Sequence, residues 1–316
     1  MRFPCPLLLA VVCATLARCE TPMASGLLSM ESAIPLSIRN EVDVAIENGR
    51  VYLEGRQGPD GFWALAEGAE RSSLPAFAFL EPPVFGMEPS EPLRKALSGA
   101  LKRLSERAPY VQSREALRAM AEDALVVAAA LSVFGEQVLP EGTDPAVLAS
   151  VRTRLAGIDL RGEAPATAWL CRTVLDLLPG QSDDPSVWES LYRNIAVQGN
   201  PAVRDVAIAG YARLRRDHGA DGPPALRAHL RWLRTHADVF TGASGNQTPE
   251  DLYYLAAFLN ATPPVLALES GIPADWRTDI AQDLIASAKA KDGGSRWTDT
   301  DPIRQTLFAV ATLITL

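Results

Sequence analysis

The sequence is poor in cysteine, and its four cysteines are unevenly placed. Cys5, Cys13 and Cys19 lie within the first 19 residues, and only Cys171 lies in the remaining chain. A disulfide within the body of the protein is therefore excluded, because it needs two cysteines there. Cys171 lies in an apolar helical segment, where a buried and unreactive thiol is the expected state.

Histidine and positive charge are also scarce. The 316 residues include three histidines, and 30 basic residues stand against 38 acidic ones, for a formal net charge of −8. This balance argues against a nucleic-acid-binding protein, which needs a basic face. His229 and His236 share a helical face but are about 10 Å apart along it, too far to bind one metal ion. The sequence predicts neither a metal ion nor another cofactor.

The N-terminal apolar run is too short to cross a membrane. It covers residues 7–16 and follows the positively charged Arg2, whereas a spanning helix needs about 20 residues. This pattern is typical of a secretory signal peptide. We therefore predict a signal in residues 1–19, a linker in 20–35 and a single domain in 36–316, in a protein exported to the periplasm or the extracellular space.

The end of the signal allows more than one reading. The sequence Thr15-Leu16-Ala17 fits ordinary cleavage after Ala17. The sequence Leu16-Ala17-Arg18-Cys19 is similar to a bacterial lipobox, in which Cys19 would carry the lipid, although Arg18 stands where a small residue is expected. A retained N-terminal anchor is the third reading. A lipid at Cys19 is the only membrane attachment that we predict for the mature protein.

The body of the chain alternates two kinds of helical segment. No region shows the two-residue alternation of a strand, so no sheet is predicted. Amphipathic helices are expected to begin near residues 37, 90, 144, 185, 223 and 274. Between them lie segments that are apolar on nearly every side, at 74–80, 124–134, 166–178, 206–212, 252–259 and 306–316.

This alternation predicts a fold class. A helix that is apolar on every side must be covered on every side, whereas an amphipathic helix leaves one face in water. Six pairs of this kind fit two concentric layers, with the apolar helices inside and the amphipathic helices outside. We therefore predict an all-α fold, an (α/α)6 toroid, with an open helical solenoid as the alternative.

A turn sequence occurs twice, near the two ends of the body. The stretch EGRQGPDGFW, residues 54–63, contains Gln57, Asp60, Gly61 and Trp63. It resembles the Q-x-x-D-G-x-W repeat of the superfamily of squalene-hopene cyclases and protein prenyltransferases. A second, degenerate copy has Asp292, Gly293 and Trp297 but no preceding glutamine. The segments DLYYLAAFL and DWRTDIAQDL also resemble the closing section of single-toroid bacterial relatives.

The resemblance implies a structural role for the motif. In that superfamily the glutamine side chain and the tryptophan indole tie one helix pair to its neighbour. The residue chemistry agrees, because glycine permits a tight turn, aspartate bonds turn backbone, and a buried indole has one donor to satisfy. We accordingly expect all seven repeat residues to be structural.

The catalytic signatures of the superfamily are missing. The string nearest to the D-x-D-D acid of the cyclases is Asp299-Thr300-Asp301-Pro302, which lacks the last aspartate. The body has no Asp-x-Cys zinc string and no thioester motif. We therefore expect a binding or scaffold module, which takes an apolar or isoprenoid small molecule in its lumen or a protein partner on its rim.

An enzyme is the alternative. Inner helices of a toroid run parallel, so their N-termini gather at one mouth, and acidic residues lie near several of these starts. Asp251 and Asp301 are the catalytic candidates, acting as acid and base on a glycan or an isoprenoid. The accompanying ligand-binding candidates are Tyr253, Tyr254, Asp123 and Asp205. The competing interpretation is that these acids cap their own helices.

Overall fold

The structure is a computed structural model of the full chain. It describes residues 34–65, 71–80, 88–107, 113–144, 146–158, 163–178, 201–216, 224–241, 247–291, 294–298 and 301–316. The predicted signal peptide, Cys19 and most of the predicted linker lie outside these residues, as do Asp292 and Gly293. Within the described part of the chain, no helix combines the length and the apolar character that crossing a bilayer requires.

The described residues are mainly helical, which confirms the all-α prediction. The amphipathic segments form α2 (Leu36–Glu54), α3 (Glu91–Arg107), α5 (Ala146–Ala156), α9 (Pro224–His236) and α12 (Trp276–Ser287). The apolar segments form η1 (Leu74–Phe79), α4 (Arg114–Phe134), α6 (Pro165–Leu177), α8 (Val203–Arg216), α10 (Pro249–Ala261) and α13 (Pro302–Thr315). Three short helices connect them, namely η3 (Glu136–Val138), η4 (Asp238–Phe240) and α11 (Pro264–Glu269). The amphipathic helix expected near 185 lies outside the described residues.

Burial separates the two kinds of helix as their sequences predict. In α4 every residue from Ala119 to Ala130 is buried, and in α13 every residue from Thr306 to Leu313 is buried. In α2, by contrast, the buried residues are confined to one stripe, Val42, Ala45, Gly49, Tyr52 and Leu53. The apolar helices therefore lie inside the molecule and the amphipathic helices cover them.

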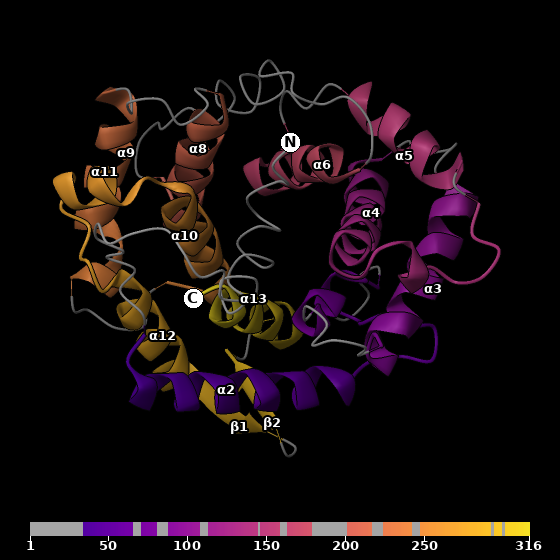
Figure 1. The fold of residues 1–316 in the computed structure, drawn as a ribbon, viewed down its shortest axis with the longest axis horizontal. Helices are drawn as coiled ribbons and strands as arrows, with labels where there is room; N and C mark the ends of the chain where they lie inside the picture. Colours follow the sequence, from indigo (N-terminus) through magenta and orange to yellow (C-terminus); the bar gives the residue numbers. More distant parts are fainter. Residues whose placement is uncertain are drawn as a thin grey trace, which may run out of the picture.

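The inner elements are neighbours in chain order. Helix α4 packs against α6, α6 against α8, α8 against α10, and α10 against α13. The first of these elements, η1, packs against both α4 and α13, so the start and the end of the body are in contact. Figure 1 shows α4, α6, α8, α10 and α13 around the middle of the molecule, with α2, α3, α5, α9 and α12 outside them.

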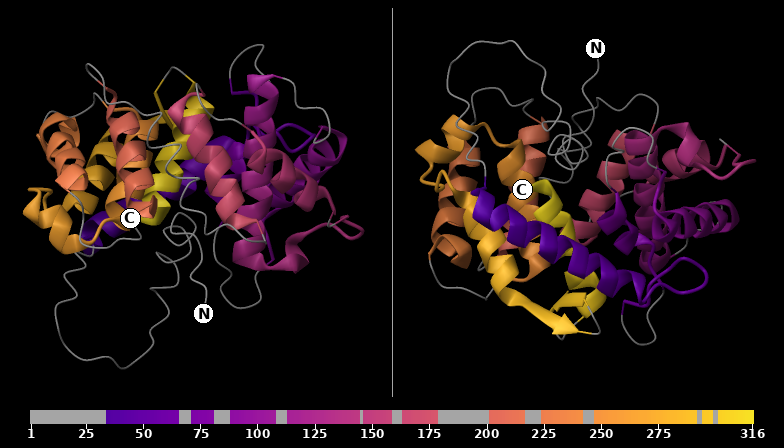
Figure 2. Two further views of the ribbon diagram at one scale, coloured as in Figure 1. Left: turned by 90° about the horizontal axis from the view of Figure 1, so that it is seen from above. Right: turned by 60° about the horizontal axis from the view of Figure 1, so that its bottom comes forward.

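The contact between the two ends of the body depends on a close approach at Gly49. A Cβ atom at this position would lie 2.4 Å from Cγ2 of Val310 in α13 and 3.2 Å from the ring of Trp297. Glycine thus lets α2 lie directly on the last helix. Figure 2 shows α2 running beside α12 and the strand that follows it, in agreement with the contacts between these elements.

The structure also contains a short β-ribbon that the sequence pattern did not predict. Strand β1 (Ala288–Lys291) pairs antiparallel with β2 (Gly294–Trp297), and Ala288 lies opposite Trp297. Four residues are too few to show a strand alternation, which explains the omission. β2 packs on α2 and α13, so the ribbon carries Trp297 into the core.

The apolar segment 74–80 also differs in detail from its prediction. It forms the 3₁₀ helix η1 rather than an α-helix, with Pro75 near its start. All six residues of η1 are buried. A short 3₁₀ helix of six residues therefore takes the place of an inner α-helix in the first pair.

Close packing and three hydrogen bonds define the turn at 57–63. Gly61 has a φ of +85°, and a Cβ atom there would lie 2.3 Å from the carbonyl oxygen of Lys95, so only glycine fits. Oδ1 of Asp60 accepts a bond from the backbone N–H of Phe62 at 3.3 Å. Nε2 of Gln57 donates to the carbonyl of Gly61 at 3.0 Å and to that of Pro92 at 2.7 Å, which links the turn to the start of α3.

The two tryptophans of the repeat make equivalent hydrogen bonds. The indole N–H of Trp63 donates to the carbonyl of Leu53 at 2.7 Å, and that of Trp297 donates to the carbonyl of Leu284 at 2.6 Å. Each acceptor lies in the last turn of the preceding outer helix, α2 or α12. Both indoles are fully buried, so each one ties the C-terminus of an outer helix into the core.

The role of Trp63 can be tested by removing its donor. Trp63→Phe removes the indole bond to the carbonyl of Leu53, which keeps its bond from the backbone N–H of Arg56 at 3.0 Å, and it reduces the volume of the side chain. We expect the free energy of unfolding to fall by about 2–4 kcal/mol, measured by urea denaturation. We expect Trp297→Phe to lower the free energy of unfolding by a similar amount.

The matched control is Trp232→Phe. Trp232 lies on outer helix α9, where its ring stacks on that of His236 with centroids 4.2 Å apart. Its replacement should lower the free energy of unfolding by less than about 1 kcal/mol. A loss at Trp63 no larger than that at Trp232 would contradict the structural role of the repeat.

Candidate functional site

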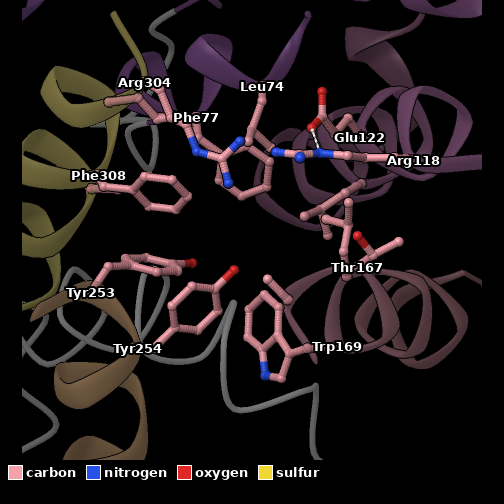
Figure 3. Close-up of a pocket in the computed structure, with 15 residues that line it drawn as sticks. Leu74, Phe77, Arg118, Glu122, Thr167, Trp169, Tyr253, Tyr254, Arg304 and Phe308 are labelled. Atoms are coloured by element: carbon pink, nitrogen blue, oxygen red, sulfur yellow. Dashed lines mark hydrogen bonds and ion pairs between the residues drawn. The ribbon is translucent and has the colours of Figure 1, made fainter. Parts of the chain in front are cut away.

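A pocket lies among the N-terminal halves of the inner helices. Its walls come from η1, α4, α6, α10 and α13, and the space free of protein atoms, including its opening, is about 520 Å³. Figure 3 shows the side chains that point into it. The complete lining is Leu74, Phe77, Arg118, Glu122, Leu125, Ala166, Thr167, Trp169, Leu170, Tyr253, Tyr254, Arg304, Leu307, Phe308 and Ala311.

One wall of the pocket is a cluster of aromatic rings. The ring of Trp169 meets that of Tyr254 edge to face, with centroids 5.2 Å apart. Tyr253 packs against Tyr254 at 5.4 Å and against Phe308 at 5.2 Å. Such edge-to-face contacts hold the rings in fixed orientations, so the wall is a preformed apolar surface.

The opposite side carries two arginines, each held by a buried glutamate. Nε of Arg118 donates to Oε1 of Glu122 at 2.9 Å, and Oγ of Ser72 donates to the other oxygen, Oε2, at 2.5 Å. Arg304 forms a bidentate pair with Glu250, at 3.1 Å from Nε and 2.7 Å from Nη2. In Figure 3 the two guanidinium groups extend from opposite sides toward each other, across from the tyrosine hydroxyls.

Glu250 connects three inner helices. It lies in the first turn of α10, is 5 % exposed, and accepts the bidentate bond from Arg304 of α13. Nη1 of Arg204, in α8, lies 3.7 Å from Oε1 of the same carboxylate. The backbone N–H of Glu250 donates to Oε1 of Gln305 at 3.2 Å. The rim of the pocket is thus a connected network of ion pairs and hydrogen bonds.

Burial changes the acidity of the groups at this rim. Desolvation raises the pKa of Glu250 to about 7, although Arg204 and Arg118 act to lower it. Desolvation likewise raises the pKa of Asp301 to about 6, opposed by Arg118 and reinforced by Glu122. Complete burial raises the pKa of Tyr254 above its ordinary range, so its hydroxyl stays neutral.

Some of the predicted site residues line the pocket and others do not. Tyr253 and Tyr254 line the pocket as a stacking wall. Asp251 does not line it, since its Oδ2 accepts bonds from the backbone N–H and the hydroxyl of Thr248 at 3.0 and 2.7 Å, in the capping box of α10. This geometry supports the capping interpretation for Asp251.

Asp301 behaves differently from Asp251. It precedes α13 in the left-handed conformation, with φ 48° and ψ 56°, and its side chain makes no capping bond. Its Oδ1 is buried without a hydrogen-bond partner among the described residues. It also lies outside the lining of the pocket, so the expected pair of catalytic carboxylates does not face the cavity.

The remaining two candidate acids form ion pairs. Asp123 was expected near a helix start at 124, but α4 begins at Arg114, so Asp123 lies in its interior. It forms a buried ion pair with Arg103 and accepts a bond from Ser73 Oγ at 2.5 Å. Asp205, in the first turn of α8, lies 3.5 Å from Arg204. Neither aspartate lines the pocket.

The sequence analysis did not identify four charged residues at the pocket and its rim, namely Arg118, Glu122, Glu250 and Arg304. Glu250 directly precedes Asp251 in the same helix-start string, and it is this residue whose side chain turns to the rim. Arg118 and Glu122 are four residues apart on one helix, a spacing typical of surface ion pairs. Only the neighbouring elements reveal that Glu122 is buried and that Arg118 lies at a pocket, because a single helix does not show what covers it.

The described residues contain no group of three histidine, cysteine, aspartate or glutamate side chains that could hold a metal ion. Comparisons with protein-family models, with curated proteins and with solved structures find no match for this chain. The geometry of the pocket is therefore the basis on which function must be argued.

The raised pKa of Glu250 predicts a pH-dependent stability. Its folded value, about 7, exceeds its ordinary value of 4.5, so the folded state binds this proton more tightly than the unfolded chain. The stabilising contribution is complete below about pH 4.5 and is lost as the pH rises through 7. We expect Glu250→Gln to reduce the fall in unfolding free energy between pH 5 and 8 by about 1–3 kcal/mol.

Denaturation at a series of pH values measures this slope. Glu269→Gln is the control, because Glu269 forms an exposed ion pair with Arg227 on the outside of the molecule, and it should keep the wild-type slope. Burial also raises the pKa values of Asp123 and Asp301 to about 6, so their deprotonation likewise lowers the stability as the pH rises. Part of the fall in unfolding free energy should therefore remain in Glu250→Gln. An unchanged slope in that variant would show that Glu250 is not the titrating group.

Proposed function

We propose that this protein is a binding module with an (α/α)6 toroid fold, and that its central pocket takes an apolar small molecule. The observation that carries the proposal is the aromatic wall of Trp169, Tyr253, Tyr254 and Phe308, which lines open space where inner helices meet. Protein interiors are otherwise closely packed, and ligand sites are concave, mostly apolar and largely preformed.

The order of helix contacts supports the toroid. The inner elements follow one another in space as they do in sequence, and η1 contacts both α4 and α13. An open solenoid would leave its first and last inner elements apart. The two turn–tryptophan units, at Trp63 and Trp297, lie in the first and last pairs, where the resemblance to the cyclase and prenyltransferase superfamily puts its structural repeats.

The same resemblance suggests an isoprenoid chain as one apolar ligand. The N-terminal sequence adds export, with Cys19 as the lipid attachment site if the lipobox is used. A protein partner on the rim is the other class of ligand that a scaffold of this kind binds. The lined pocket favours the small molecule over the protein partner.

The arrangement of the acids favours binding over catalysis. Acid–base action on a glycan or an isoprenoid needs two carboxylates facing the substrate. Asp251 is engaged in its capping box, and neither Asp251 nor Asp301 lines the pocket. The glutamates at the rim are held by arginines, which fits a positioning role better than proton transfer.

Filling the pocket tests the proposal. Ala166 lies at the start of α6, faces the cavity and is only partly buried, so Ala166→Phe places a ring inside the space. We expect the wild-type protein to bind the uncharged fluorescent probe N-phenyl-1-naphthylamine saturably. The variant should bind it at least about tenfold more weakly, a loss of about 1.4 kcal/mol.

Ala149→Phe provides the matched control, because Ala149 is exposed on outer helix α5. It should bind the probe as the wild-type protein does, and thermal unfolding of both variants checks that they are folded. Absence of saturable binding by the wild type, or equal binding by Ala166→Phe, would refute the pocket as a ligand site.

A further inference from the structure

We infer that the ligand of this pocket carries a singly charged oxyanion, a carboxylate, at the end of its apolar body. The inference rests on the proposed binding function and specifies the polar end of the ligand. Its basis is the balance of hydrogen-bond donors, acceptors and charges around the two arginines of the pocket.

The carboxylates at the pocket are already paired. Both oxygens of Glu122 accept a bond, one from Arg118 and one from Ser72. Both oxygens of Glu250 accept from Arg304. A cationic ligand group, such as an ammonium, would lie beside the two guanidinium groups and compete with them for these carboxylates. Breaking a buried ion pair is costly, because it leaves a desolvated charge without a partner.

Donors, by contrast, remain available. Among the described residues, the hydrogen bond of the Arg118 side chain uses Nε and leaves both Nη groups. This side chain is 40 % exposed, and Figure 3 shows its guanidinium directed over the cavity toward that of Arg304. Arg304 uses Nε and Nη2 on Glu250, which leaves Nη1. Planar guanidinium donors in this arrangement match the two oxygens of a carboxylate.

The charges at the rim favour a ligand with a single negative charge over one with two. Arg118, Arg204 and Arg304 face Glu122, Glu250, Asp301 and Asp205, and Asp251 also acts on Arg204, so carboxylates outnumber arginines at the rim. Burial raises the pKa of Glu250 to about 7 and that of Asp301 to about 6, so partial protonation reduces this negative charge near neutral pH. Each additional negative charge on a ligand would still be repelled by the remaining carboxylates in a poorly solvated site.

The aromatic wall provides a surface for the apolar end of the ligand. In Figure 3 the rings of Trp169 and Tyr254 lie across the cavity from the guanidinium groups, and the ring of Phe308 lies beside Arg304, with its centroid 5.5 Å from Cζ. A molecule with its carboxylate at Arg118 would therefore lay its apolar body against these rings. The pocket has the two-ended character of a site for an amphiphile, with the charged end at the rim.

Three probes with the same ten-carbon chain test the inference by isothermal titration calorimetry on the full chain. These are decanoate, decanol and decyl phosphate, which differ in the charge of the head group. At pH 7 we expect decanoate to bind at least tenfold more tightly than decanol, and decyl phosphate to bind no more tightly than decanoate. Arg118→Gln should weaken decanoate binding about tenfold and leave decanol binding within twofold.

Arg227→Gln is the matched control, because Arg227 lies in an exposed pair with Glu269 on the outside of the molecule. It should bind all three probes as the wild type does. Retained decanol binding by Arg118→Gln shows that its pocket is folded, and Arg118→Lys, which keeps the charge, should recover part of the decanoate affinity.

The outcomes separate this inference from the proposed function. Equal binding of decanol and decanoate, or unchanged decanoate binding in Arg118→Gln, would overturn the carboxylate while leaving an apolar site. Tighter binding of decyl phosphate than of decanoate would overturn the single charge. If the wild-type protein binds none of the three probes, the proposed function itself fails.

Discussion

Six inner elements that are apolar on nearly every side impose the main constraint on this structure. Such elements are stable only when other elements cover them, because exposed apolar surface costs free energy in proportion to its area. The amphipathic helices provide this cover, and the contact of α2 with α13 through Gly49 joins the two ends of the body. The buried indoles of Trp63 and Trp297 then secure the C-termini of α2 and α12. The pocket exists because the inner elements meet around a centre that their own side chains do not fill.

Burying the charged groups at the rim of the pocket costs desolvation free energy, so their presence there indicates a role other than stability. Glu250 and Glu122 are 5 % exposed, and a buried ion pair contributes little net stability compared with apolar residues of the same volume. Stability alone does not explain why Arg118 and Arg304 both lie at the pocket, each paired with a glutamate. In the proposed site a ligand end group uses their remaining donors, and the glutamates hold the two guanidinium groups in place.

The sequence was sufficient for the parts of the structure that depend on periodic patterns. Among the described residues, the order of apolar and amphipathic segments and the turn at 57–63 were predictable, since side-chain periodicity and turn chemistry act over a few residues. The ribbon that carries Trp297 was not, because four-residue strands show no period. Tyr253 and Tyr254, predicted as ligand-binding residues one turn into an inner helix, line the pocket.

The charged residues of the site were harder to predict, for a physical reason. Asp251 and Glu250 are adjacent in sequence, yet one caps its own helix while the other reaches Arg304, 54 residues away. That choice depends on the side chains that α13 and α8 bring to the rim. The sequence shows helix starts, whose dipoles favoured the aspartates there as candidates, but it does not show which glutamates and arginines lie at the pocket and its rim.

A crystal structure with 10-bromodecanoate bound would test the central claim most directly, because the anomalous signal of bromine locates the apolar end of the ligand. The account predicts bromine beside Trp169, Tyr254 and Phe308, with the carboxylate within hydrogen-bond distance of an Nη atom of Arg118. Bromine outside the ring of inner helices, or a carboxylate directed away from Arg118, would contradict it.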